Sequence, residues 1–448
     1  MFPAGCGRAR AEVTRPYDAG SVLVLAHLVT TSGLPLPRWL LAYLLAFAAL
    51  LVVTGLRASH PARRWPEVQR APDRDDTRLR TATHVVGAVL YLATITVAFF
   101  ATNDSGYFAS LVVVVGFWIA GLTAALLVGD WFRFLNPFPL IARLVARRSA
   151  DGGDDTEAPS WTAAVMLFGF LWFWLVYGER VPTNLDTGLF LVVYAVATTA
   201  GIVLFGAQWL ATGEGFTATF DLVGSLSPIG RDASTGRPRL RSPVRGAAER
   251  GAVPGTALLA SVLLGGAAFE GLAQTAWWSD SVVGTRTSTS LVLVNTVGLL
   301  WVALIVYVGI VGTARVATRL AGRDATGLAD LAATAAAAIA LGGWVAYELP
   351  QLVVDSQNLV ALASDPLGRG DDLFGTITNQ PNLTLIPTKV QGVLSVVALT
   401  LGVMAAAVLA VEAAFASFPP RRAATAVWPL AVAVSIAAGG ASLLLLGQ

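Results

Sequence analysis

Long apolar stretches, separated by shorter polar segments, are the main pattern along this chain. Ten of them lie at 38–56, 84–101, 108–128, 161–178, 188–208, 254–272, 290–312, 328–348, 390–412 and 425–446. A helix needs roughly 20 apolar residues to cross the hydrocarbon core of a bilayer, which is about 30 Å thick. A membrane β-barrel would instead show alternating segments of about ten residues. The pattern therefore predicts an all-α fold, a polytopic transmembrane helical bundle of about 10 spans.

Composition agrees with this prediction and excludes several classes of protein. Of the 448 residues, 55% are hydrophobic and 13% are charged, whereas a soluble chain is about 25% charged. The lipid bilayer is therefore the first partner that we expect. The net charge is only +2 and no basic run carries interleaved aromatic residues, so we expect no nucleic acid partner. The one cysteine, Cys6, excludes an internal disulfide framework.

We expect a single polytopic domain over 27–448, preceded by an N-terminal extension or weak signal segment at 1–26. Arginines precede the short apolar run "GSVLVLA" in that first segment, as in a signal peptide. Cleavage after Ala26 would make His27 the first residue of the mature chain.

Arginines gather in alternate loops. They are frequent after the first, third, fifth, seventh and ninth stretch, and the other loops, including 349–389, are poor in basic residues. Because cytoplasmic loops carry an excess of Lys and Arg, this alternation predicts a multi-pass protein of the cell (plasma) membrane with both termini outside. Two cytoplasmic segments, 130–148 and 215–230, mix aromatic, aliphatic and charged or polar residues. We expect both to lie in the headgroup plane.

Two acids stand where an apolar stretch ends, in "YELPQLVVDSQN" (347–358). Glu348, Gln351 and Asp355 lie on one helix face if the helix continues through Pro350. An ionisable group below the membrane interface is costly and usually faces a bundle interior or a cavity. We interpret Glu348 as a catalytic base, proton relay or cation ligand of an outward-facing site, with Gln351 and Asp355 as site contacts nearer the water. The alternative is that the span ends sooner and these side chains are interfacial.

A further acid, Glu270, stands in "FEGLAQTAWW" (269–278), on the same predicted side of the membrane as Glu348. Gln274 follows one helical turn later on the same face. Two carboxylates from separate helices can share a proton or a cation when they meet. Glu270 is therefore a second catalytic candidate and Gln274 a site contact, and the sequence leaves open whether the two acids meet.

The outer loop carries another group of candidates, in "SDPLGRGDDLFGT" (364–376). Asp365 and Asp372 are candidate site ligands, and Arg369 is a candidate clamp for an anion. With His27, the two carboxylates are the candidate ligands of a divalent metal ion, the cofactor that such side chains suggest. The alternative is a solvated loop without a binding role.

Four segments, spread in order over nearly the whole chain, resemble one family. They are "AHLVTTSGLPLPRWLLAY" (26–43), "RFLNPFPLIARL" (133–144), "FEGLAQTAWW" (269–278) and "SDPLGRGDDLFGT" (364–376). The family is that of multi-span prokaryotic membrane proteins labelled fenitrothion hydrolase. The resemblance implies phosphotriester cleavage at a membrane, and the positions that match are His27, Glu270, Asp365, Gly368, Gly370, Asp372 and Gly375.

The chain also departs from that family's pattern. The segment "WVAYELPQL" lacks the histidine that the family often has before the outer loop, and "LTLGVMAAA" lacks a Gly-His in the next-to-last span. If the family uses those imidazoles, Glu348 would have to replace them here.

Three functions are compatible with these residues. The first is phosphotriester hydrolysis at an outward-facing acidic site. The second is cation- or proton-coupled transport of a small solute through the same acids. The third is a non-catalytic membrane subunit, within a homo- or hetero-oligomer, that docks an external partner through the acidic loop.

Overall fold

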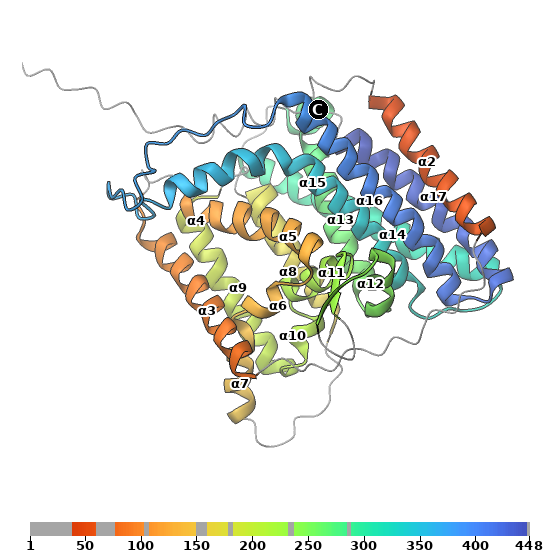
Figure 1. Cartoon of the computed structure of the whole chain (residues 1–448), viewed down its shortest axis with the longest axis horizontal. Coiled ribbons are helices and arrows are strands. Elements are labelled where there is room, and N and C mark those ends of the chain that lie inside the picture. Colours follow the sequence, from red (N-terminus) through yellow and green to blue (C-terminus); the bar gives the residue numbers. More distant parts are fainter. Residues whose placement is uncertain are drawn as a thin grey trace, which may run out of the picture.

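The computed structural model describes residues 38–59, 77–102, 107–148, 159–177, 182–231, 237–284 and 288–445. Most of this part of the chain is helical, which confirms the predicted all-α fold (Figure 1). Within it, nine helices are long and apolar enough to cross a membrane, and a shorter apolar helix covers Trp161–Tyr177. The protein is therefore a multi-pass membrane protein.

The helices of membrane-crossing length are α2 (Arg38–Ser59), α3 (Thr77–Phe100), the continuous run of α4 (Phe108–Leu111), η1 (Val112–Ala120) and α5 (Gly121–Val128), α9 (Asn184–Phe205), α13 (Thr256–Ala273), α14 (Ser288–Ala321), α15 (Leu328–Leu362), α16 (Thr388–Ser417) and α17 (Pro420–Leu445). The shorter apolar helix consists of α8 (Trp161–Trp172) and η2 (Phe173–Tyr177). The remaining elements are α6 (Phe132–Leu135), α7 (Phe138–Arg148), α10 (Trp209–Thr212), α11 (Gly215–Ser225), the antiparallel hairpin β1 (Ile229–Arg231) and β2 (Pro238–Leu240), α12 (Pro243–Arg250) and η3 (Trp278–Val283). Three of these segments, η1, η2 and η3, are π-helical, a form that is rare and frequent at functional sites.

Helix α15 lies between two groups of helices (Figure 1). It packs against α13 and α16 on one side, where α2, α14 and α17 complete the group, and against η1 on the other, towards α3 and α9. The crossing of α15 and α16 is close because glycines face each other there. A Cβ at Gly402 would lie 2.6 Å from the carbonyl oxygen of Ala338 and 3.0 Å from the Cα of Gly342. Small residues at such crossings let helices pack closely in a bilayer.

Contacts between helix ends divide these ends into two sets. In one set, the Arg422 guanidinium of α17 donates to the carbonyl oxygen that follows α14. The N–H of Ala257 donates to Asp330 in the same set, so α13 and α15 begin side by side. In the other set, the Thr102 hydroxyl, after α3, donates to the carbonyl of Gly368, after α15. The helix ends of the first set adjoin arginine-rich loops, and those of the second set adjoin arginine-poor loops. The orientation of the helices in the membrane stays a prediction.

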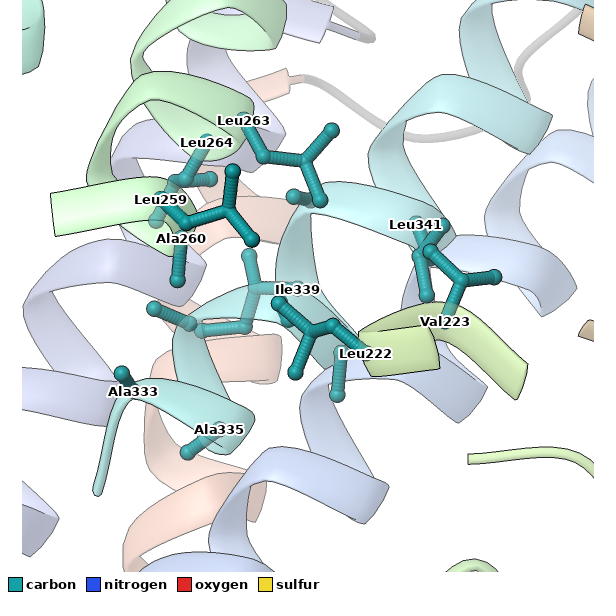
Figure 2. Close-up of a cluster of buried hydrophobic side chains, with 14 of the residues drawn as sticks. Leu222, Val223, Leu259, Ala260, Leu263, Leu264, Ala333, Ala335, Ile339 and Leu341 are labelled. Atoms are coloured by element: carbon teal, nitrogen blue, oxygen red, sulfur yellow. The ribbon is translucent and has the colours of Figure 1, made fainter. Parts of the chain in front are cut away.

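Helix α11 contradicts the expectation of a headgroup-plane helix at 215–230. Most of its residues are buried among other helices. Figure 2 shows Leu222 of α11 beside Ile339 of α15. At its start, the Phe216 ring lies 6.3 Å from that of Trp118, which is midway along the α4–η1–α5 run. The apolar residues of α11 therefore pack against protein, and its N-terminal end lies near the middle of the bundle.

Candidate functional site

Helix α15 continues through Pro350 and beyond residue 348, where the apolar stretch was expected to end. Proline has no N–H, which leaves the carbonyl of Ala346 without its helical donor. The Ser395 hydroxyl of α16 donates to this carbonyl at 2.6 Å. The neighbouring helix thus replaces the missing hydrogen bond, and α15 extends to Leu362.

Glu348, Gln351 and Asp355 form a buried group on this helix, which we call the acidic stripe. Glu348 is 1% exposed and Asp355 is 2% exposed. Asp355 is therefore as buried within the protein as Glu348, and its depth in the membrane stays a prediction. Asn358 donates to Oδ1 of Asp355 at 3.2 Å, whereas Oδ2 has no hydrogen-bond partner among the described residues. Because a buried carboxylate is costly to ionise, such residues in membrane helices usually serve a function.

Glu348 lines a small pocket between α15 and the η1–α5 run, together with Trp118 and Trp344. We call it the tryptophan pocket. The rings of Trp118 and Trp344 meet edge to face at 6.1 Å, and Trp174 of η2 stacks on Trp344 at 5.2 Å. In the described structure, neither the Trp118 nor the Trp344 indole N–H has an acceptor. The pocket volume of about 10 Å³ is close to that needed for one water molecule. Glu348 therefore shares its pocket with two tryptophans whose indole N–H groups have no acceptor in the described structure.

A larger cavity of about 360 Å³ lies between α3, η1, α6, α9 and α11. Leu359 of α15, one turn beyond Asp355, contributes to its wall. Most of the lining is apolar, and its aromatic members are Tyr91, Phe117, Trp131, Phe132, Phe138, Phe190, Tyr194 and Phe216. The volume and the lining are those of a small-molecule pocket. We call it the aromatic cavity.

A buried hydrogen-bond network supports one wall of the aromatic cavity. Glu214 is 0% exposed and caps α11, accepting from two backbone N–H groups at 3.0 and 2.7 Å and from the Tyr194 hydroxyl. The Asn136 side chain donates to the Thr217 hydroxyl at 2.9 Å, and Nδ1 of His84 lies 2.8 Å from the Asn136 carbonyl oxygen. We call this set the Glu214 network. It ties α3, α9 and α11 together behind the cavity.

The sequence pattern alone did not reveal the Glu214 network. Glu214 stands in "ATGEGFTATF", which we assigned to a cytoplasmic loop. Two signals were present: an acid directly before an apolar helix suits a cap, and His84 is the one histidine inside an apolar stretch. Nothing in the spacing indicated that they would meet, because their contact is made through Asn136 and Thr217.

Glu270 and Gln274 lie at the end of α13. Glu270 is buried, and Gln274 is half-buried at the helix C-cap. Gly271 packs against α17, since a Cβ there would lie 2.5 Å from the Leu444 carbonyl oxygen. Glu270 thus stands beside the α13–α17 contact, while Glu348 lines the tryptophan pocket. A shared site for the two acids stays a prediction.

The loop 364–376 is organised by its own carboxylates. Asp365 accepts from the backbone N–H groups of Arg369 at 2.9 Å and Gly370 at 2.8 Å. Asp372 accepts from the Ser364 hydroxyl at 2.6 Å. Both acids therefore hold backbone and side-chain groups of the loop, and Arg369 is exposed.

The glycines of the same loop have a conformational reason. Gly368, Gly370 and Gly375 have φ angles of 66°, 88° and 68°, in the left-handed region that favours glycine. The hydrogen bond from Ser364 lowers the pKa of Asp372, so this acid stays ionised and keeps accepting hydrogen bonds. The segment 364–376 thus encodes a compact loop.

The candidate metal ligands His27, Asp365 and Asp372 stay a prediction, because His27 lies outside the described residues. No group of three His, Cys, Asp or Glu side chains in the part of the chain that the structure describes could hold a metal ion. Asp365 and Asp372 accept the hydrogen bonds given above.

Asp130, just after α5, is a further acid with an altered environment. Burial raises the pKa of Asp130 to about 6, and the charge of Asp221 adds to this, against a hydrogen bond from the Arg133 N–H. It therefore titrates closer to neutral pH than an ordinary aspartate does.

No family model, curated protein or solved structure matches this chain.

Proposed function

We propose that this protein is a proton-coupled transporter of a small apolar solute in the cell membrane. One observation carries the proposal: α15 places Glu348 in the tryptophan pocket and Leu359 in the aromatic cavity, with the buried Asp355 between them. These positions are i, i+7 and i+11, so they share one face of the helix. A proton site and a solute site therefore lie on the same helix.

Protonation of Glu348 gives this arrangement a way to couple the two sites. In a buried site the neutral acid is more stable than the ionised one. Gain or loss of the proton therefore changes how strongly the carboxyl group interacts with the hydrogen-bond donors around it. Helix α15 can bend at Pro350, where a single hydrogen bond from Ser395 replaces the helical one. Bending would shift Leu359 against the aromatic cavity. Broken and short helices near mid-depth, such as α11, also surround binding sites in secondary transporters.

Proton flux in vesicles tests this proposal. The purified chain is reconstituted into vesicles that enclose a pH-sensitive dye, and fenitrothion is added outside as a neutral aromatic probe. We expect a change of internal pH that depends on the probe, and a loss of about tenfold or more in Glu348→Gln, because an amide cannot carry the proton. Glu412→Gln, on neighbouring α16, is the matched control and should retain the flux. Equal flux in Glu348→Gln and the unmodified chain would reject the proposal.

Phosphotriester hydrolysis is the second candidate. The observation that favours it is the Glu214 network, which places an acid and His84 behind a cavity of a size that suits a nitrophenyl ring. A carboxylate or an imidazole is the usual general base for activating water.

The same preparation separates the two candidates through nitrophenolate absorbance. Release of nitrophenolate that is lost in Glu214→Gln and His84→Gln, without proton flux, would establish hydrolysis. Loss of that release in the presence of a chelator would indicate that the reaction needs a metal ion. Proton flux without release of nitrophenolate would support transport. The absence of both would favour the non-catalytic subunit.

A further inference from the structure

Three arginines converge on one carboxylate where β2 leads into α12. Arg239, Arg241 and Arg245 all form ion pairs with Glu249, the last two at 2.8 and 3.1 Å. Burial alone would raise the pKa of Glu249, but hydrogen bonds from Arg241 and Arg245 and the charge of Arg239 bring it below its usual value. One negative charge therefore faces three positive charges, and the group keeps an excess of positive charge. We call it the arginine cluster.

The three arginines differ in how many of their N–H donors are used. Arg241 also donates to the carbonyls of Gly224 at 2.9 Å and Ser227 at 3.3 Å, so it fixes the hairpin to the end of α11. The Nε of Arg239 is buried without a hydrogen-bond partner in the described structure. The Arg245 side chain is 57% exposed and bonds to Glu249 through Nε. Arg241 is thus structural, whereas Arg239, with a side chain that is 24% exposed, and Arg245 can still donate from their guanidinium ends to an anion.

The arginine cluster lies at the level where membrane-crossing helices begin. Arg250, at the end of α12, donates to Asp221 at 2.6 Å and to the hydroxyl of Thr256, the first residue of α13. Leu240, between Arg239 and Arg241, is 84% exposed. An exposed apolar side chain flanked by arginines is typical of a segment that contacts the boundary of headgroups and acyl chains.

We propose that Arg239 and Arg245 bind the phosphate of an anionic phospholipid headgroup, with Leu240 inserted beside its acyl chains. Guanidinium groups form paired hydrogen bonds with phosphate oxygens, which suits two arginines with unused donors. Anionic lipids attract such groups at the cytoplasmic surface, where the arginine alternation places this segment. The bound lipid would supply the negative charge that Glu249 alone does not.

Native mass spectrometry of the full chain in detergent tests this. The chain is mixed with phosphatidylglycerol or with phosphatidylcholine, and the bound lipids are counted. We expect retained phosphatidylglycerol to fall about fivefold or more in Arg239→Gln/Arg245→Gln, with phosphatidylcholine unchanged. Arg315→Gln/Arg319→Gln, which removes two exposed arginines of α14 on the same predicted side, is the matched control and should retain the lipid. Arg245→Gln alone, at the most exposed position, should show a smaller loss in the same direction and guards against misfolding of the double variant.

Two results would overturn the assignment. One is equal retention of phosphatidylglycerol by the unmodified chain and both arginine variants. The other is an increase in melting temperature with inorganic phosphate that depends on Arg239 and Arg245, without preferential retention of phosphatidylglycerol, since that would identify a free phosphate site.

Discussion

Polar side chains in this protein differ in whether their hydrogen-bonding groups have partners. Asp365 and Asp372 accept hydrogen bonds from their own loop, and Glu214 accepts from Tyr194 and α11. The Trp118 indole instead has no acceptor in the described structure. An unused buried donor costs about 1–3 kcal/mol, unless water or a ligand satisfies it. The unsatisfied indoles thus mark the tryptophan pocket as a place for function, whereas Asp365 and Asp372 support their own loop.

Asp130→Asn should stabilise the protein at neutral pH. The folded pKa of about 6 lies above the ordinary aspartate value, so ionisation of Asp130 opposes folding. The penalty is absent below the unfolded pKa, grows as pH rises between the two values and is constant above about 6. Asp130 is partly exposed, so solvent screens part of this effect. We therefore expect the substitution to raise the free energy of unfolding by about 1–2 kcal/mol. The melting temperature of Asp130→Asn should exceed that of the unmodified chain at pH 8 and approach it near pH 4.

The opposite sign is expected for Asp372, whose pKa is lowered by the Ser364 hydrogen bond. Its stabilising contribution is present above the unfolded pKa and is lost as pH falls through the folded one. Asp372→Asn should therefore lower the melting temperature at pH 8 and have less effect near pH 3. A uniform effect of either substitution at all pH values would contradict this account.

At the scale of elements, α15 shows how a helix passes a proline inside a bundle. Pro350 removes one helical hydrogen bond, and Ser395 of the adjacent helix supplies a donor to the free carbonyl of Ala346. The close glycine crossing of Gly342 and Gly402 brings α16 near enough for this contact. The hydrogen bond from α16 therefore supports the helix at the point where it carries the acidic stripe.

A double-mutant cycle tests this account. Ser395→Ala should destabilise the protein by about 1–2 kcal/mol, because the buried Ala346 carbonyl then lacks a donor. In a Pro350→Ala background the restored backbone N–H can serve that carbonyl, so the same substitution should cost less than half as much. The measurement is the free energy of unfolding in denaturant or the melting temperature of each of the four proteins. Additive effects would show that Pro350 and Ser395 are not coupled in this way.

At the scale of the whole molecule, α15 joins two helix groups that each hold part of the candidate site (Figure 1). The aromatic cavity and the Glu214 network belong to the group of α3, α9 and η1. The glycine crossing and Ser395 belong to the other group. Relative motion of the groups would therefore act directly on the acidic stripe.

Cysteine labelling tests how this molecule lies in the membrane. In a Cys6→Ser background, Arg369→Cys should react with a membrane-impermeant maleimide added outside intact cells, because the arginine-poor loops are predicted to be external. Pro238→Cys, exposed in the hairpin, should react only after the cells are lysed. The reverse pattern would show that the orientation is inverted.

The sequence by itself determined the approximate place of the long apolar helices, because an apolar stretch long enough to cross a bilayer is a local property. It also determined the loop 364–376, whose glycines and aspartates act within a few residues of one another. Only the tertiary structure decided that α15 continues past Pro350, that α11 is buried and that His84 and Glu214 share a network. Each of these depends on a donor, acceptor or apolar surface supplied by a residue far away in the chain, and a pattern of neighbouring residues carries no record of such partners.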